Sequence, residues 1–188
     1  IQMSAQVCDL AQPLSFPDLA GKKKTFFYPG SSIGNFTPDQ VSSFFRNIAT
    51  ICDGSGGLLI GVDLVKDSDV LQRAYDDSLG ITAAFNLNVL KHVNRIIGSD
   101  FDVLDWEHYA VFNQEQSRIE MHLRAKRDLV VTWPSQSINF KAGEMIHTEN
   151  SYKYTKASFS DLLINAGFDD VQIWTDPQEL FMVCYAKA

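Results

Sequence analysis

The polar residues best placed for chemistry follow two apolar segments of the chain. Asn35 ends the Gly/Ser-rich loop 29–35, which comes directly after the apolar run 25–28, and Asp63 stands near the end of the apolar run 58–64. Apolar runs that lead into such loops are typical of buried parallel strands, and ligands bind at the carboxyl ends of these strands. This edge is therefore a candidate site, although Asn35 could equally cap the following turn and Asp63 a loop.

A second group of polar residues lies further along the chain. Tyr75 falls in segment 66–80, which the pattern predicts to be a helix with a turn, and Glu149 and Ser151 are separated by one residue. On a strand this spacing places both side chains on one face. Each has a purely structural alternative: Tyr75 as a half-buried packing residue, and Glu149 with Ser151 as exposed strand positions. Met121 could simply belong to the core.

The elements that must position the first group form a strand, helix, strand unit. Thr37, Pro38 and Gln40 begin a helix as N-cap, first and third residues. The apolar stripe of this helix comprises Val41, Phe44, Phe45 and Ile48. Because the runs on either side are continuous and apolar, we expect a right-handed βαβ unit with parallel strands. The glycine-rich segment 54–57 precedes a strand, so it is interpreted as a turn and not as a cofactor loop, which would follow one.

The middle of the chain shows a different periodicity. Segment 82–97 reads as a long helix, and segment 106–140 alternates as in an antiparallel meander with turns at 113–117 and near 127–128. The apolar set expected for the long helix is Phe85, Leu87, Leu90, Val93 and Ile97. The tail returns to the first pattern. It has a helix over 156–166 capped by Thr155 and closed by Gly167, followed by strands over 171–175 and 180–186.

Composition excludes several classes of function. The chain has 188 residues, of which 45% are hydrophobic and 21% charged, and a net charge of −7. It has no apolar stretch near the roughly 20 residues that span a bilayer, and no basic cluster beyond 22–24 that would favour nucleic acid. Three distant cysteines in apolar surroundings predict reduced thiols in a cytoplasmic protein. The four histidines form no HxxxH pair, so no metal site is expected.

Five stretches, in order along the chain, resemble the histidine N-α-methyltransferases of ergothioneine biosynthesis. They span most of the chain, and the tail resembles the closing segment of class I methyltransferases, in which the last strand inserts antiparallel. The stretches are 29–36 (PGSSIGNF), 61–67 (GVDLVKD), 74–77 with 82–86 (AYDD and TAAFN), 118–121 (RIEM) and 144–154 (EMIHTENSYKY).

The resemblance implies an α/β fold: the C-terminal part of a class I, Rossmann-like methyltransferase sheet with an inserted α+β substrate-binding subdomain. The corresponding divisions are 1–72 for the core sheet, 73–153 for the subdomain and 154–188 for the closing helix and hairpin. It also implies S-adenosylmethionine as cofactor and L-histidine as the small-molecule substrate, with no nucleic acid or membrane partner. An exposed apolar sheet edge leads us to expect a homodimer.

The resemblance also implies a role for individual residues. Asn35 corresponds to the residue that hydrogen-bonds the α-amino group, and Tyr75 to one that contacts the carboxylate end; these two are the candidate catalytic residues. Glu149 and Ser151 correspond to the pair that reads the two imidazole nitrogens. The remaining matches are Gly30 and Met121 in the substrate pocket, and Asp9 and Leu10 in a short segment whose Asp contacts the adenine of the cofactor.

These residue types suit methyl transfer to an amine. The attacking amine must be neutral and aligned, and an Asn can orient it without a charge that would keep it protonated. The glycine-rich cofactor loop of the family is not found in this sequence, so the isolated chain is expected to be inactive. Two alternatives remain: a methyltransferase for another small amine, and a non-catalytic binding or assembly module that kept the fold.

Overall fold

The computed structural model describes residues 3–10 and 12–188. Its contacts divide the chain into two compact units, one formed by residues 1–65 and 153–188 and the other by residues 66–152. The first of these divisions comes before the helix α2 (Ser68–Tyr75), whereas the sequence placed it at 72/73. The reason is that α2 packs against two strands of the second unit, β3 and β4, whose bounds are given below.

The first unit is built on a mixed four-stranded sheet. Its strands, in the spatial order β1-β2-β9-β8, are β1 (Lys24–Tyr28), β2 (Gly56–Asp63), β9 (Phe181–Lys187) and β8 (Asp170–Thr175). β1 and β2 are parallel and are connected by the helix α1 (Pro38–Cys52), which confirms the predicted βαβ unit. β9 lies antiparallel between β2 and β8, as the resemblance of the tail implied.

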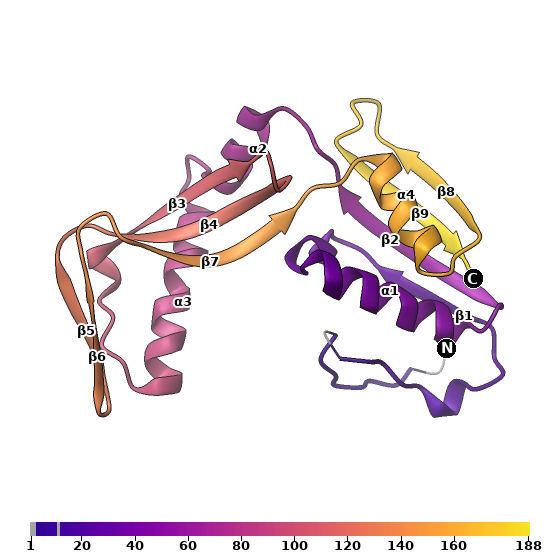
Figure 1. Ribbon diagram of the computed structural model, residues 1–188, viewed down its shortest axis with the longest axis horizontal. Helices are drawn as coiled ribbons and strands as arrows, with labels where there is room; N and C mark the ends of the chain where they lie inside the picture. The colour runs from indigo at the N-terminus through magenta and orange to yellow at the C-terminus, as the bar shows by residue number, and fades with distance from the viewer. Residues whose placement is uncertain (1–2, 11) are drawn as a thin grey trace. The chain divides into compact units, whose positions relative to one another are not determined.

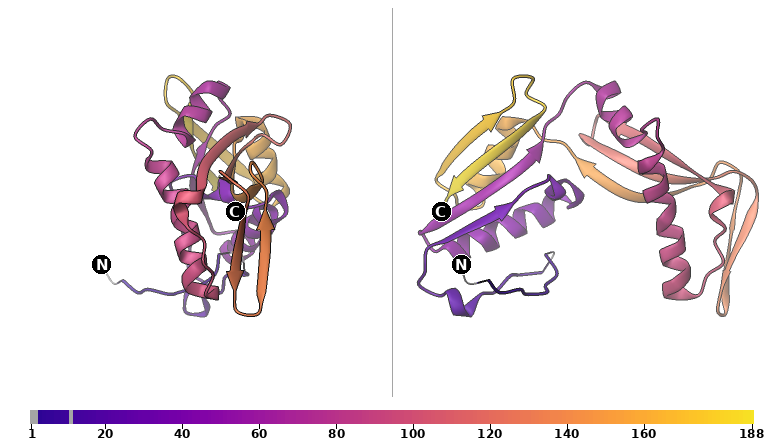
Figure 2. Two further views of the ribbon diagram at one scale, coloured as in Figure 1. Left: turned by 90° about the vertical axis from the view of Figure 1, so that its left-hand side faces the viewer. Right: turned by 180° about the vertical axis from the view of Figure 1, so that it is seen from behind.

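Two capped helices cover one face of this sheet (Figures 1 and 2). In α1 the Thr37 hydroxyl accepts from the backbone N–H of Gln40, and the Gln40 side chain accepts from Thr37 N–H, so the predicted capping box is present. Thr155 caps the helix α4 (Lys156–Asn165) in the same way. The two helices meet where Phe45 of α1 packs edge-on against Phe159 of α4, with ring centroids 5.5 Å apart.

The opposite face of the same sheet carries exposed apolar side chains. Phe27 of β1 is 70% exposed and Trp174 of β8 is 53% exposed. Both lie on the sheet face away from α1 and α4, because their neighbours along each strand are turned toward those helices. Within the described residues β1 and β8 are the edge strands of this sheet.

The second unit contains a three-stranded antiparallel sheet and a separate hairpin. The sheet has the order β3 (Trp106–Asn113), β4 (Arg118–Ala125), β7 (Met145–Tyr152). The sequence predicted one meander over 106–140, but β5 (Leu129–Trp133) and β6 (Gln136–Phe140) pair only with each other. The turn between β3 and β4 is where it was predicted.

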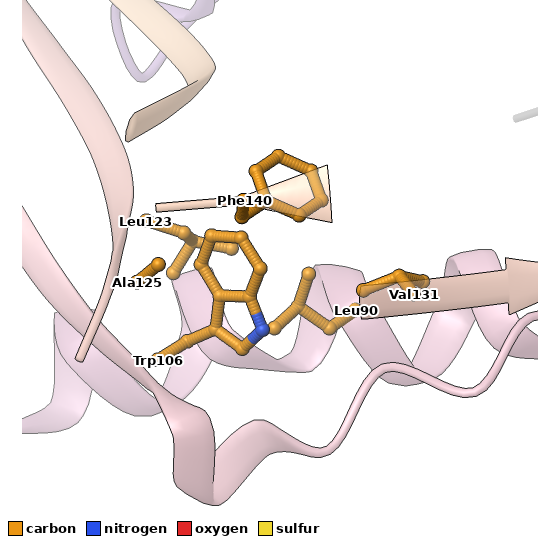
Figure 3. Packing of buried hydrophobic residues seen from close by; sticks show 6 residues of the cluster. All are labelled: Leu90, Trp106, Leu123, Ala125, Val131 and Phe140. Carbon is orange, nitrogen blue, oxygen red and sulfur yellow. The ribbon is translucent and has the colours of Figure 1, made fainter. Parts of the chain in front are cut away.

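The core of the second unit lies between the long helix α3 (Ile81–Ile97), the sheet and the hairpin. Trp106 is 1% exposed and packs edge-on against Phe140 of the hairpin at 5.0 Å between ring centroids (Figure 3). The apolar face predicted for α3 was partly wrong. Phe85 and Ile97 are exposed, and the fully buried residues of the helix are Leu90 and Asn86.

The remaining short elements are the 3-10 turns η1 (Pro17–Leu19), η2 (Ser32–Asn35) and η3 (Val103–Asp105). The three cysteines are free thiols. Cys52 and Cys184 are buried as expected, and burial raises the pKa of Cys184 to about 12, but Cys8 is exposed. None of the helices described is long and apolar enough to cross a membrane.

Candidate functional site

The C-terminal end of α2 brings a tyrosine hydroxyl onto the sheet of the second unit. Tyr75 is the last residue of α2, and its Oη lies 2.8 Å from Oγ of Ser151 on β7. Ser151 is only 6% exposed. Two residues 76 positions apart in the sequence are thus joined by a hydrogen bond, and both are predicted site residues.

Strand register places the other two predicted residues of this unit beside that pair. Met121 of β4 lies opposite Glu149 of β7, and Ile119 lies opposite Ser151. Since side chains alternate along a strand, Glu149 and Ser151 share one face with Ile119 and Met121. This is the face that packs against α2, because Ile119 and Met121 form a buried cluster with Leu71, against which Tyr75 also packs. Met121 is therefore a core residue at the border of the candidate site.

A polar network that is buried at one end holds the backbone at Tyr75. Nε2 of His108 lies 2.7 Å from the carbonyl oxygen of Tyr75, and because a carbonyl only accepts, Nε2 carries the proton. Nδ1 of the same ring then accepts from Nδ2 of Asn86 at 2.9 Å, and Asn86 Nδ2 also donates to the carbonyl oxygen of His122 at 3.0 Å. Asn86 is 1% exposed, whereas His108 and Tyr75 are half-buried, so the network is shielded from water at its Asn86 end.

Sequence reasoning missed Asn86 and His108 as supporting residues. Asn86 lies in one of the quoted stretches, 82–86, and it precedes Leu90 by four residues. That helical spacing puts Asn86 and Leu90 on one face of α3. The spacing could therefore have indicated that Asn86 is buried, but the prediction considered apolar residues only. Nothing local marks His108, because its role depends on a helix terminus 33 residues away.

The carboxylate of Asp77 accepts hydrogen bonds from the first backbone N–H groups of α3. Its oxygens accept from the backbone N–H groups of Thr82 and Ile81 at 2.8 and 3.0 Å, and these bonds lower the pKa of Asp77 to about 2. Such a carboxylate satisfies N–H groups that have no partner within the helix. Asp77 therefore fixes the start of the helix that carries Asn86.

The first unit presents the other predicted group at the carboxyl ends of β1 and β2. Asn35 is exposed and ends η2, and Gly30 has a φ of +79°, a conformation that favours glycine. The loop is fixed to β2 because the backbone N–H of Asp63 donates to Oγ of Ser31 at 2.8 Å. The strand ends thus hold the short turn that exposes Asn35.

The side chain of Asp63 has a structural partner. Its Oδ2 lies 2.9 Å from Nζ of Lys153, and the lysine side chain is only 1% exposed. An ammonium group buried to this extent requires an opposite charge or several acceptors. The sequence left Asp63 as either a site residue or a structural one. This contact favours a structural role, because the ion pair holds the chain at the residue that follows β7.

The predicted cofactor residues lie in the segment before β1. Asp9 is exposed, and Leu10 lines a small cavity against α1 with Gln40 and Phe44. Further along this segment, the backbone N–H of Leu14 donates to Oδ1 of Asn47 at 2.8 Å. The segment is therefore attached to the outer side of α1.

The glycine-rich turn serves strand packing. A Cβ at Gly56 would lie 1.8 Å from the carbonyl oxygen of Lys24, and one at Gly57 would lie 2.3 Å from that of Ala186. Both glycines belong to β2 and let neighbouring strands approach. The predicted turn is thus limited to Gly54 and Ser55, and Gly56 and Gly57 begin β2. Because the segment leads into a strand and not into a helix, it does not have the position of a cofactor loop.

The predicted residues thus fall into separate groups. Tyr75, Met121, Glu149 and Ser151 come together in the second unit. The first unit holds Gly30 with Asn35 at the strand ends, and Asp9 with Leu10 in the segment before β1.

A family model and several relatives among the known proteins identify the family. The model described as "Histidine-specific methyltransferase, SAM-dependent" matches residues 1–188. The histidine N-alpha-methyltransferase of Mycolicibacterium smegmatis is 40% identical over 179 residues, covering 94% of this chain and 56% of that protein. That of Mycobacterium tuberculosis is 40% identical over 158 residues, covering 83% and 49%. Ergothioneine biosynthesis protein 1 of Neurospora crassa is 32% identical over 178 residues, covering 93% and 20%. The chain therefore spans about half the length of the bacterial relatives.

Proposed function

Because the chain belongs to the histidine-specific, S-adenosylmethionine-dependent methyltransferases, as its sequence predicted, we propose that it provides the substrate-binding part of an enzyme that methylates the α-amino group of L-histidine. The observation that carries the proposal is the grouping of Tyr75, Glu149 and Ser151 on one sheet face. This grouping supplies a carboxylate and two hydroxyl groups beside a buried apolar cluster.

In the proposed reaction the nitrogen lone pair of histidine forms a bond to the methyl carbon. The methyl group would come from S-adenosylmethionine with the thioether as leaving group, and the amine would lose one proton to solvent. S-adenosylmethionine supplies the electrophilic methyl group, and the protein contributes position and desolvation. Asn35 would orient the neutral amine through its amide, because an Asn both donates and accepts without carrying charge.

The imidazole ring would be read by Glu149 and Ser151. A carboxylate accepts from the protonated ring nitrogen, and a hydroxyl can donate to the other nitrogen. Tyr75 would contact the carboxylate end of the amino acid, while its bond to Ser151 sets the direction of the serine hydroxyl. A pocket with these polar groups should reject side chains that leave them unpaired.

The residues of this chain fit the cofactor only in part. The exposed carboxylate of Asp9 has the acceptor chemistry for the adenine amino group, and Leu10 offers an apolar contact beside it. The glycine-rich segment 54–57 leads into β2 instead of following a strand, and Gly56 and Gly57 lie inside β2, so it is not assigned to the cofactor. We therefore assign no other cofactor contact to this chain.

The test is methyl transfer from labelled S-adenosylmethionine to histidine by the complete protein that carries this chain. We expect histidine to be methylated and leucine to be left unchanged. Glu149→Gln keeps the shape of the side chain, removes its charge and should raise the KM for histidine at least tenfold, since hydrogen bonds to charged groups contribute about 1.5–3 kcal/mol. Equal activity on leucine would point to another amine, and no transfer to any amine would favour a non-catalytic module.

We also propose that the protein works in the cytoplasm as a homodimer. Free thiols at all three cysteines suit a reducing compartment. The exposed edge strand β1, with Phe27 70% exposed, is a surface on which a second copy could pair. Phe27→Lys should then shift the mass measured by light scattering from dimer to monomer, and a monomeric wild-type protein would contradict the proposal.

A further inference from the structure

Three potential metal ligands lie on the sheet face opposite Tyr75 and Ser151. Glu120 and His122 of β4 alternate with Met121, so their side chains leave the other face of the sheet. The register of β4 and β7 shifts between Met121 and His122, which places His147 of β7 directly opposite His122. Glu120, His122 and His147 therefore converge although 25 residues separate the two histidines.

The distances are close to those of a shared metal ion. One ligand atom from each residue lies within 4.8 Å of the other two, and Nε2 of His122 lies 3.8 Å from Oε2 of Glu120. The two imidazole centroids are 4.7 Å apart. Metal–nitrogen bonds of about 2.1 Å at a tetrahedral angle put two ring centroids roughly 5 Å and two ligand atoms roughly 3.4 Å apart. Small side-chain rotations would close the remaining gap.

The groups around these ligands resemble the outer shell of a metal site. Nε2 of His147 lies 3.2 Å from the carbonyl oxygen of Glu149, to which it can only donate, so Nδ1 keeps its lone pair. Metal-binding histidines commonly donate their second N–H in this way. Oε1 of Glu120 accepts from Arg118 at 2.7 and 2.9 Å and from Asn113 at 2.9 Å. These bonds orient the carboxylate, whose Oε2 is the oxygen nearest His122.

A buried nitrogen without a partner is the second observation. Among the described residues, Nδ1 of His122 is buried and makes no hydrogen bond, and the side chain is 12% exposed. Buried polar atoms are nearly always satisfied in folded proteins, so an orphaned imidazole nitrogen calls for a ligand or a rearranged ring.

We propose that Glu120, His122 and His147 form a site for one divalent transition-metal ion of the zinc, cobalt or nickel type. Two imidazoles and a carboxylate suit these ions and leave open positions for water. The guanidinium of Arg118 beside Glu120 lowers the affinity relative to an isolated carboxylate. The ion would join β4 to β7 close to Glu149, and this proposal does not depend on the methyl-transfer function.

The test is a titration of the whole chain, without an affinity tag, with Co²⁺ followed by Zn²⁺. We expect visible absorption from one bound Co²⁺ per chain, loss of this absorption on adding Zn²⁺, and a higher melting temperature with Zn²⁺. His147→Gln should weaken binding at least tenfold and abolish the shift in melting temperature. His92→Gln is the matched control, since His92 is exposed on α3, and should bind like the wild type.

Binding of equal strength in His147→Gln and the wild type would overturn the proposal, as would the absence of saturable binding in the wild type. A measurement on the wild-type chain alone tests the proposal even if His147→Gln does not fold. In the wild-type chain Zn²⁺ should shift the imidazole NMR signals of His122 and His147 and leave those of His92 and His108 in place. Unchanged signals from His122 and His147 would exclude the site.

Discussion

Nε2 of His108 donates to the carbonyl oxygen of Tyr75 over 2.7 Å, so a side chain on β3 sets where α2 ends. Asn86 completes the arrangement by donating to Nδ1 of His108. Neither His108 nor Asn86 has a substrate contact in the proposed site. They are positioning residues for the Tyr75 hydroxyl, and a kinetic consequence follows from that role.

His108→Phe should raise the KM for histidine roughly tenfold, because it removes one well-placed hydrogen bond of about 1.4 kcal/mol and loosens Tyr75. The ring volume is kept, so kcat should change less than KM. The measurement is steady-state methyl transfer by the complete protein, with His92→Phe on the exposed side of α3 as control. A loss of stability with an unchanged KM would show that His108 serves only the fold.

Tyr75 and Ser151 should be energetically coupled through their 2.8 Å hydrogen bond. Tyr75→Phe and Ser151→Ala each remove the same contact, so the double variant should lose less histidine affinity than the two single losses added together. We expect a coupling energy of about 1 kcal/mol from calorimetric titration of histidine. Strict additivity would mean that the two hydroxyl groups act independently on the ligand.

Local signals predicted the first unit well. The capping box at Thr37, the continuous apolar strands β1 and β2, and the helix-Gly-strand pattern of the tail are all contained in short stretches of sequence. Each of these signals acts between residues a few positions apart, which is why the βαβ unit and the closing hairpin were found with bounds within two residues of those in the structure.

Relations across strands could not be predicted in the same way. The burial of Asn86 depends on His108 and His122, and the convergence of His122 with His147 depends on a register shift. An alternating pattern predicts strands but not which strands pair, so β5 and β6 were wrongly joined to the meander. The family resemblance selected Tyr75, Glu149 and Ser151, which the structure places at one face of the second sheet, and their roles toward the substrate stay predictions.

The ion pair between Asp63 and Lys153 should be costly to break on one side only. Asp63→Asn removes the carboxylate from a lysine that is 1% exposed, and we expect a loss of about 3–5 kcal/mol in the free energy of unfolding. Adding Lys153→Met should restore much of this loss, because the buried charge is then gone. Urea denaturation of the single and double variants measures both effects, and a double variant as unstable as Asp63→Asn would contradict this account.

Asp77 should make the start of α3 sensitive to acid. Its pKa is about 2 in the folded chain, below its value in the unfolded chain, because the N–H groups of Thr82 and Ile81 favour the carboxylate. A lowered folded-state pKa means that the stabilisation is complete above the unfolded pKa of about 3.9 and is lost as the pH falls toward 2. Asp77→Asn should therefore flatten the decline in stability between pH 4 and about 2. Circular dichroism during acid titration of the two proteins would show this, and parallel curves would count against it.

Gly56, the first residue of β2, should be the least replaceable residue of the glycine-rich segment 54–57. An alanine there would place Cβ 1.8 Å from the carbonyl oxygen of Lys24 at a φ of +127°, so β1 and β2 would have to separate. Gly54→Ala is the matched control: its φ of +68° is also unfavourable, but nothing lies within 4 Å of the added Cβ. We expect Gly54→Ala to cost about 1 kcal/mol from the left-handed conformation alone, and Gly56→Ala to cost several times more through lost strand pairing. Equal melting temperatures for the two variants would contradict this. They would show that position 56 requires glycine for its backbone conformation and not because β1 approaches closely.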